Sequence, residues 1–299
     1  RAGIKAGDRI LKVEGEPTKK MTLMEAVKKM RGPKGTKVTI TIMREGFEEP
    51  KDFTIVRDII RIKSVKSRML EDGVGYVRIR TFHKTTSKEL DRALDTLREK
   101  GMKALVLDLR NNPGGLLRQA VEVADAFLDE GSLVVYTKGR LRNQNLRFPT
   151  SKGGLLEVPM VVLVNGGSAS ASEIVSGALQ DLGRAVILGT KTFGKGSVQS
   201  IVPLSDGSGL RLTTAHYYTP KDRLIQGKGI TPDIIVPMPE HALARRPALP
   251  SPGEAREKGP APPVLGGDQD PQLRRAVEIL KSWDIFKKGA SRGALPKAS

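Results

Sequence analysis

Short apolar segments alternate with helical segments between residues 74 and 238, and this alternation constrains the fold more than any other feature. Two of the segments, Ala104–Leu109 and Met160–Val164, are apolar almost throughout, which indicates buried strands. Each ends in a turn rich in glycine and asparagine that leads into a predicted helix. Strands that alternate with helices are typical of layered proteins. The sequence therefore predicts an α/β (α+β) core with a mixed β-sheet and flanking helices.

Residues 1–62 are expected to form a separate small domain in front of this core. They contain an alternating strand, a helix over 22–30 and two further strands joined by a turn. Thr22 and Glu25 have the spacing of a capping box, so the helix is expected to begin there. Strands and one helix in so short a segment are typical of a small mixed domain.

The end of the chain has a different composition. Residues 237–263 hold eight prolines and few apolar anchors, which is typical of a linker. A last helix is predicted over 271–283, where apolar residues recur at helical spacing, and its packing on the core is left open. The expected organisation is a first domain at 1–62, a core at 63–238 and a tail of linker and helix at 239–299.

Composition excludes several classes of function. The net charge is +18, but the 51 Lys and Arg residues form no dense block and aromatic residues are only 4%, which disfavours nucleic-acid binding. A nucleic-acid or envelope-surface binder driven by charge stays only as a third alternative. The absence of cysteine excludes disulfides and thiolate nucleophiles, and three histidines disfavour a multi-histidine metal site. No run of 18 apolar residues is present in this stretch.

Two strand-to-helix turns carry the residues that suggest chemistry. Residues 108–115 form a turn whose backbone N–H groups would face a helix N-terminus, which suits an anion or an oxyanion, although an ordinary glycine-rich turn is the commoner interpretation. Residues 167–173 place serines among small residues at a helix start. A hydroxyl there lies in a field that favours developing negative charge. The alternative is that Ser168 or Ser170 is simply an N-cap.

A nucleophilic serine needs a base. His83 lies in a polar loop, His216 in a predicted strand and His241 in the proline-rich stretch, and none sits beside a glycine-rich turn. A Ser-His-Asp triad is therefore only weakly supported by the sequence.

Lysine can act as the base when burial keeps it neutral. Lys195 has glycine on both sides, and Phe193 and Val198 are expected to supply apolar surroundings. If this segment is an extended strand, Lys195, Ser197 and Gln199 point the same way, and Gln199 could orient the amine. A single lysine among 51 cationic residues is far more often a solvated surface group, so the role of Lys195 depends on the motifs around it.

Several motifs in order support that role. The sequences NGGSASASEI at 165–174 and TFGKGSVQ at 192–199 resemble the carboxyl-terminal processing peptidases, also called tail-specific proteases, which are serine peptidases with a Ser-Lys dyad and a PDZ domain. Four further segments fit the same family: GYVRIRTF at 75–82, DLRNNPGG at 108–115, LTTAHYYTP at 212–220 and GKGITPDIIV at 227–236. At the N-terminal end, RAGIKAGDRILKVEGEP and GPKGTKVTITIMREG resemble the second half of a PDZ domain. The front strands and the carboxylate-binding loop of that domain would precede Arg1, so the PDZ domain is expected to be incomplete.

The resemblance implies roles for individual residues. Ser170 matches the nucleophile, Lys195 the general base and Gln199 the residue that positions the base. The N–H groups of Gly115 and Ala171 match the oxyanion hole, with Gly114 as the neighbouring option.

The resemblance also implies a function. The expected reaction is endoproteolysis near the carboxyl terminus of unfolded or tail-exposed protein substrates, with the PDZ domain recognising the tail and with no metal or cofactor. The expected location is extracytoplasmic, with a signal peptide or membrane anchor upstream of Arg1 left open, as are the oligomeric state and a regulatory adaptor. The main alternative is a catalytically silent, PDZ-bearing adaptor that only binds protein tails.

Overall fold

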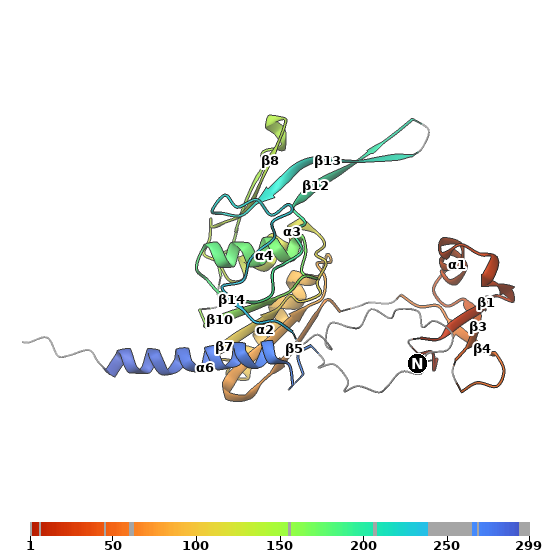
Figure 1. Ribbon diagram of the computed structural model, residues 1–299, viewed down its shortest axis with the longest axis horizontal. Helices are drawn as coiled ribbons and strands as arrows, with labels where there is room; N and C mark the ends of the chain where they lie inside the picture. Colours follow the sequence, from red (N-terminus) through yellow and green to blue (C-terminus); the bar gives the residue numbers. More distant parts are fainter. Residues whose placement is uncertain are drawn as a thin grey trace, which may run out of the picture. The chain divides into compact units, whose positions relative to one another are not determined.

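A computed structural model divides the chain into two compact units, residues 1–62 and 63–299 (Figure 1). The structure describes residues 2–5, 7–44, 46–59, 63–154, 157–205, 208–238, 265–267 and 269–292, with side chains through residue 283 in the last range. Most of the predicted linker, including His241, lies outside the described residues.

The first unit contains a four-stranded antiparallel sheet in the order β2-β1-β3-β4. Its elements are β1 (Arg9–Val13), β2 (Glu16–Pro17), the 3-10 helix η1 (Thr18–Lys20), α1 (Leu23–Met30), β3 (Lys37–Met43) and β4 (Lys51–Val56). The apolar residues of β3 alternate inward and pack with Val13. Thr22 caps α1, and the Glu25 carboxylate accepts the Thr22 N–H at 2.7 Å, which confirms the predicted capping box. Leu23, the first residue of this helix, is 79% exposed despite its apolar side chain.

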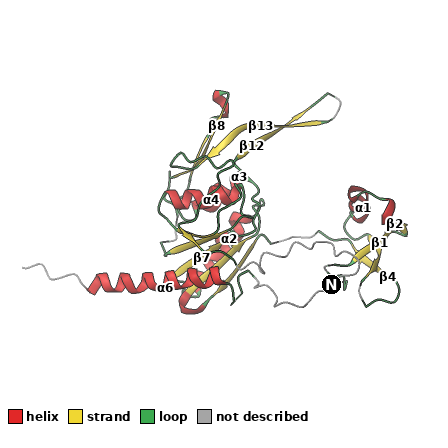
Figure 2. Ribbon diagram, in the orientation of Figure 1, coloured by secondary structure: helices red, strands yellow, loops and turns green. Residues whose placement is uncertain are grey.

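The second unit is built on a six-stranded sheet in the order β14-β11-β10-β7-β6-β5. Its strands are β5 (Val65–Met69), β6 (Val74–Ile79), β7 (Ala104–Asp108), β10 (Met160–Val164), β11 (Val186–Gly189) and β14 (Ile234–Ile235). All neighbours are parallel except β5, which pairs antiparallel with β6. Helical crossovers between parallel strands explain why β7 and β10 are apolar on both faces. The predicted mixed sheet with flanking helices is confirmed (Figure 2).

Helices cover both faces of this sheet. One face packs against α2 (Thr86–Glu99), α3 (Leu117–Asp125) and α4 (Ala171–Asp181). The other face packs against α6 (Pro271–Arg292) through Leu273, Ala276 and Leu280. The helix predicted to start at Pro271 therefore docks on the core, the choice that the sequence left open. Within the described part of the chain, no helix has both the length and the apolar composition that a membrane crossing needs.

A second sheet lies beside the helices of the first face. Its order is β12-β13-β8-β9, with β8 (Leu133–Gly139), β9 (Arg147–Pro149), β12 (Ser197–Pro203) and β13 (Gly209–Tyr218). The strands β12 and β13 form a long hairpin that extends away from the body of the second unit (Figure 1). The remaining elements are two 3-10 helices, η2 (Glu71–Gly73) and η3 (Arg142–Gln144).

Candidate active site

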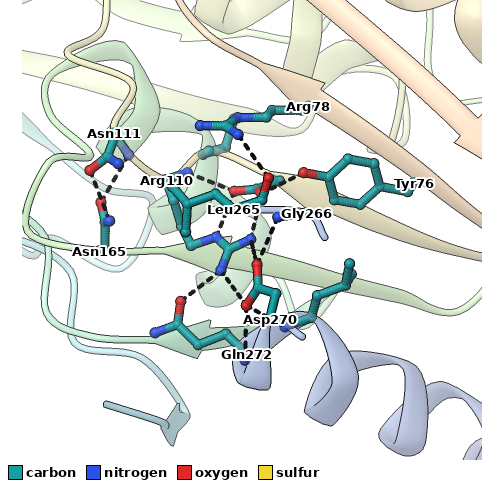
Figure 3. A network of polar contacts seen from close by, with 12 residues as sticks. Tyr76, Arg78, Arg110, Asn111, Asn165, Leu265, Gly266, Asp270 and Gln272 are labelled. Carbon is teal, nitrogen blue, oxygen red and sulfur yellow. Dashed lines mark hydrogen bonds and ion pairs between the residues drawn. The ribbon is translucent and has the colours of Figure 1, made fainter. Parts of the chain in front are cut away.

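The two glycine-rich turns singled out by the sequence meet at one edge of the six-stranded sheet. One turn follows β7 and the other follows β10, and these two strands are parallel neighbours. Asn111 and Asn165 join the turns: Asn111 N–H donates to Asn165 Oδ1 at 2.9 Å, and Asn165 Nδ2 donates to Asn111 Oδ1 at 3.0 Å (Figure 3). The carboxyl ends of parallel strands are where α/β proteins place their sites. The turns therefore form one structural unit.

Ser168 and Ser170 have different environments within the second turn. Ser168 is fully buried, and its hydroxyl accepts from Asn165 N–H at 3.0 Å and donates to Leu109 O at 2.8 Å. The hydrogen bonds of Ser168 thus hold the two turns together. Ser170 is only half-buried at the N-cap position of α4, and its hydroxyl makes no capping hydrogen bond. Of the two serines, Ser170 is the one whose hydroxyl is available for chemistry.

The backbone of Ser170 is strained. Its φ of 55° and ψ of −112° lie in a region that residues other than glycine rarely adopt. Such outliers persist only where surrounding contacts over-determine them, and they cluster at functional sites. The Ser170 N–H donates to Glu173 at 2.8 Å, and this contact helps to hold the turn in place.

Glu173 links the serine turn to the segment that contains Lys195. Its fully buried carboxylate accepts from Ser170 N–H and Lys195 N–H through Oε2, both at 2.8 Å. Through Oε1 it accepts from Thr192 Oγ1 at 2.5 Å and from Gly194 N–H at 2.6 Å. No role for Glu173 was expected from the sequence. Its position three residues after Ser170 is that of a capping-box acid, which is the signal that could have found it.

The surroundings of Lys195 differ from the expectation. Lys195 is exposed, and Phe193 is 68% exposed, so apolar neighbours do not bury the amine. The strand β12 begins only at Ser197, so strand alternation does not relate Lys195 to Gln199, which is also exposed. Within the described residues, no hydrogen bond joins the Lys195 side chain to Ser170 or Gln199. The structure brings the backbone of Lys195 to the serine turn through Glu173, without a contact between the two side chains.

The two glycines of the first turn lie where no larger residue fits. A Cβ on Gly114 would lie 2.6 Å from Ala169 O and 2.8 Å from Ser170 Cβ, and a Cβ on Gly115 would lie 2.2 Å from Phe82 O. Both glycines also have positive φ, 97° and 151°. The absence of side chains therefore lets the backbone of this turn approach Ser170 closely.

The N–H groups near Ser170 differ in availability. Gly114 N–H donates to Asn112 Oδ1 at 2.9 Å and is occupied. Gly115 N–H has no hydrogen-bond partner among the described residues. Ala171 N–H belongs to the first turn of α4, where N–H groups have no partner within the helix. Gly115 and Ala171 are therefore better placed than Gly114 to donate to an oxyanion.

The histidines do not supply an alternative base in the described chain. His83 is exposed, and His216 lies in β13 opposite Ser197 and Lys138, with a buried Nδ1 that has no partner. No hydrogen bond connects either ring to Ser170 in the described ranges. The described residues contain no cluster of three or more His, Asp or Glu side chains that could hold a metal ion.

Sequence comparisons identify both units of the chain. Residues 73–236 match Peptidase family S41, and residues 1–43 match the PDZ domain. The chain is 53% identical over 247 residues to a carboxy-terminal-processing protease of Bartonella bacilliformis, covering 80% of this chain and 56% of that protein. It is 41% identical over 270 residues to a carboxyl-terminal-processing protease of Synechocystis, covering 89% of this chain and 62% of that protein.

A solved structure agrees with these matches. The photosystem II D1 C-terminal processing protease superimposes with a TM-score of 0.55 at 33% identity, covering 81% of this chain and 66% of that one. The chain thus spans only 56% and 62% of the two relatives. The family match nevertheless covers both glycine-rich turns, Glu173 and Lys195. The chain therefore belongs to peptidase family S41, with a PDZ-domain sequence ahead of its peptidase unit.

Proposed function

We propose that the chain acts as a serine endopeptidase that cleaves protein substrates near their carboxyl termini, with Ser170 as nucleophile and Lys195 as general base. One observation carries the proposal: the strained Ser170 is approached closely by the turn at Gly114, where a Cβ would lie 2.8 Å from Ser170 Cβ, and Glu173 ties the serine turn to Lys195. With Gly115 and Ala171 as the proposed donors, these residues would supply a nucleophile, a base and two oxyanion donors, which are the parts that acyl transfer requires.

The proposed reaction has two halves. The neutral amine of Lys195 takes the proton from Ser170 Oγ as the oxygen attacks the scissile carbonyl carbon. The N–H groups of Gly115 and Ala171 hold the oxyanion, and when the carbon–nitrogen bond breaks, the Lys195 ammonium returns the proton to the leaving amine. In the second half, Lys195 takes a proton from water, the resulting hydroxide attacks the ester carbonyl, and the Lys195 ammonium returns the proton to Ser170 Oγ as the ester bond breaks. No step requires a metal or a cofactor.

Because Lys195 is exposed, the bound substrate is proposed to cover its amine during the reaction. A bound peptide that covers the exposed amine would remove water from it, and desolvation favours the neutral form of an amine. Gln199, on the strand that follows Lys195, is proposed to orient the amine once it turns toward Ser170. The complete arrangement would thus form with substrate in place.

Recognition of a substrate tail is the second part of the proposal. The relatives are named for carboxyl-terminal processing, and a PDZ sequence lies ahead of the peptidase unit. We propose protein substrates with an accessible carboxyl terminus, bound through the PDZ domain. The extracytoplasmic location and a regulatory adaptor stay predictions.

The test combines cleavage with chemical labelling. The full-length parent protein is incubated with an unfolded reporter protein and, separately, with a serine-directed fluorophosphonate whose adduct is mapped by mass spectrometry. Fragments of the reporter and an adduct on Ser170 are expected. An intact reporter together with an unlabelled Ser170 would overturn the proposal and favour the tail-binding adaptor.

Lys195→Arg is expected to reduce the cleavage rate at least about 100-fold, because a guanidinium does not deprotonate at working pH and a general base contributes about that much or more. Lys191→Arg is the matched control, since Lys191 is also exposed and belongs to the same segment. Its cleavage rate is expected to equal that of the wild type. Normal turnover by Lys195→Arg would remove this lysine from the role of base.

A further inference from the structure

A buried ionic cluster lies directly behind the turn that carries Gly115. Arg110 is fully buried, and its guanidinium donates to Asp108. It also donates to Asp270 and Gln272 (Figure 3). Nε and Nη2 donate to the two oxygens of Asp108 at 2.9 and 2.7 Å. Nη1 and Nη2 donate to the two oxygens of Asp270 at 2.9 and 2.6 Å, and Nη1 also donates to Gln272 Oε1 at 2.9 Å. These bonds match the five N–H donors of a guanidinium, so Arg110 is held by both carboxylates and an amide.

Two of the three partners of Arg110 come from the far end of the chain. Asp270 precedes α6, and its carboxylate also accepts from Leu273 N–H at 3.1 Å and from Gly266 N–H at 2.8 Å. Gln272 lies in the first turn of α6, and its Nε2 donates to Val236 O at 2.6 Å. Burial raises the pKa of Asp270, but the hydrogen bonds and charge of Arg110 outweigh burial and bring the pKa below its ordinary value. The carboxylate is therefore ionised at neutral pH.

Arg110 is itself the start of the oxyanion turn. The turn is fixed on one side by the pair Asn111 and Asn165, and Asn112 Nδ2 donates to Ile79 O at 2.9 Å. On the other side Arg110 is fixed to α6. Between these supports the backbone continues into Gly114 and Gly115, whose conformations leave no room for a side chain. Movement of Arg110 would therefore be transmitted to Gly114, which lies close to Ser170, and to the neighbouring N–H group of Gly115.

We propose that Asp270 is a positioning residue of the peptidase site: through Arg110 it holds the turn that presents Gly115 N–H to the oxyanion, which makes α6 a support of the site. The inference rests on the proposed function of Ser170 and Gly115. Oxyanion donors act through pre-set geometry, and a displacement of about 1 Å at an active site lowers rates by roughly 100-fold.

The test is Asp270→Asn in the full-length parent. The substitution keeps the size of the side chain but removes its charge and turns an N–H donor toward a donor of Arg110. We expect kcat to fall about 10- to 100-fold with KM unchanged. Hydrogen–deuterium exchange of the peptide covering 109–117 is expected to accelerate in the same variant.

Two control variants on α6 separate positioning from general stability. Leu280→Ala shortens a buried side chain that packs α6 on the sheet as part of an apolar cluster, which does not include Arg110 or Asp270. Glu278→Gln removes an exposed carboxylate that pairs with Arg275. Compared at temperatures where each variant is folded, both are expected to keep the wild-type kcat, although Leu280→Ala lowers the melting temperature.

The outcomes distinguish this inference from the proposed function. Wild-type kcat and unchanged exchange at 109–117 in Asp270→Asn would overturn the inference while Ser170-dependent cleavage stands. The inference would also be overturned if Leu280→Ala and Asp270→Asn had the same melting temperature and lost kcat equally. The loss of kcat would then follow from reduced stability. If the wild-type parent shows no Ser170-dependent cleavage, the proposed function fails, and the exchange rates still decide whether Asp270 holds the turn.

Discussion

Ser170→Ala is expected to abolish peptide cleavage, with a loss in kcat of at least about 10⁴-fold, while the stability of the fold changes by less than about 1 kcal/mol. The chemical loss is large because alanine has no oxygen to form the ester. The structural loss is small because the Ser170 hydroxyl makes no capping hydrogen bond, so its removal leaves no buried partner unsatisfied. Initial rates on the unfolded reporter and thermal unfolding of the same samples measure the two effects.

Ser176→Ala is the matched control for this prediction. Ser176 lies on the same helix, is buried, and donates within the helix to Ser172 O at 2.8 Å and to Glu173 O at 3.5 Å. Its replacement is expected to leave cleavage unchanged. Cleavage that persists in Ser170→Ala and in the control alike would assign the activity to another nucleophile or to a contaminating protease.

Glu173→Gln is expected to lower kcat/KM by at least about 100-fold and to destabilise the fold by about 3 kcal/mol. Four groups donate to this carboxylate: Ser170 N–H, Thr192 Oγ1, Gly194 N–H and Lys195 N–H. Glutamine keeps one acceptor oxygen but turns an NH₂ group toward two of the donors, which leaves them unsatisfied in a fully buried position. Urea unfolding and cleavage kinetics at a temperature where the variant is folded measure the two losses.

The second unit offers a control with the same chemistry. Glu89 on α2 also accepts four hydrogen bonds, from Ser64 N–H, Ser64 Oγ, Val65 N–H and Thr85 Oγ1. Glu89→Gln is therefore expected to reduce stability while kcat stays normal. If Glu173→Gln behaved in the same way, Glu173 would hold the fold together without supporting catalysis.

Local features of the sequence predicted much of the fold because they depend on nearby residues. The Thr22 cap, the apolar strands β7 and β10 and the start of α6 all follow from short-range patterns, and the structure contains them. The position of Ser170 at a helix start was predictable for the same reason. The roles of Ser170, Lys195, Gln199, Gly115 and Ala171 stay predictions that the proposed experiments test.

The errors came from contacts that local patterns do not encode. Phe193 and Val198 beside Lys195 suggested burial, but Phe193 points to solvent, since the segment from Thr192 to Gly196 is held by its backbone and not by apolar packing. Arg110 pairs with Asp270, which lies 160 residues later in the sequence. No local sequence pattern indicates a pairing over that separation. A buried arginine close to a glycine-rich turn could have suggested only that an acidic partner exists somewhere in the chain.

The docking of α6 also fixes the order in which a newly made chain completes its core. During synthesis Ser170, Glu173 and Lys195 all leave the ribosome before Asp270 is made. Until then Arg110 has Asp108 as a carboxylate partner but lacks its second one, and the sheet face that Leu273, Ala276 and Leu280 cover has no helix from this segment. Pairing over so long a separation in sequence is formed late, because the loop between the partners must close first. Ser170 is thus translated first, and the proposed support of the turn at Gly115 arrives with the last described helix.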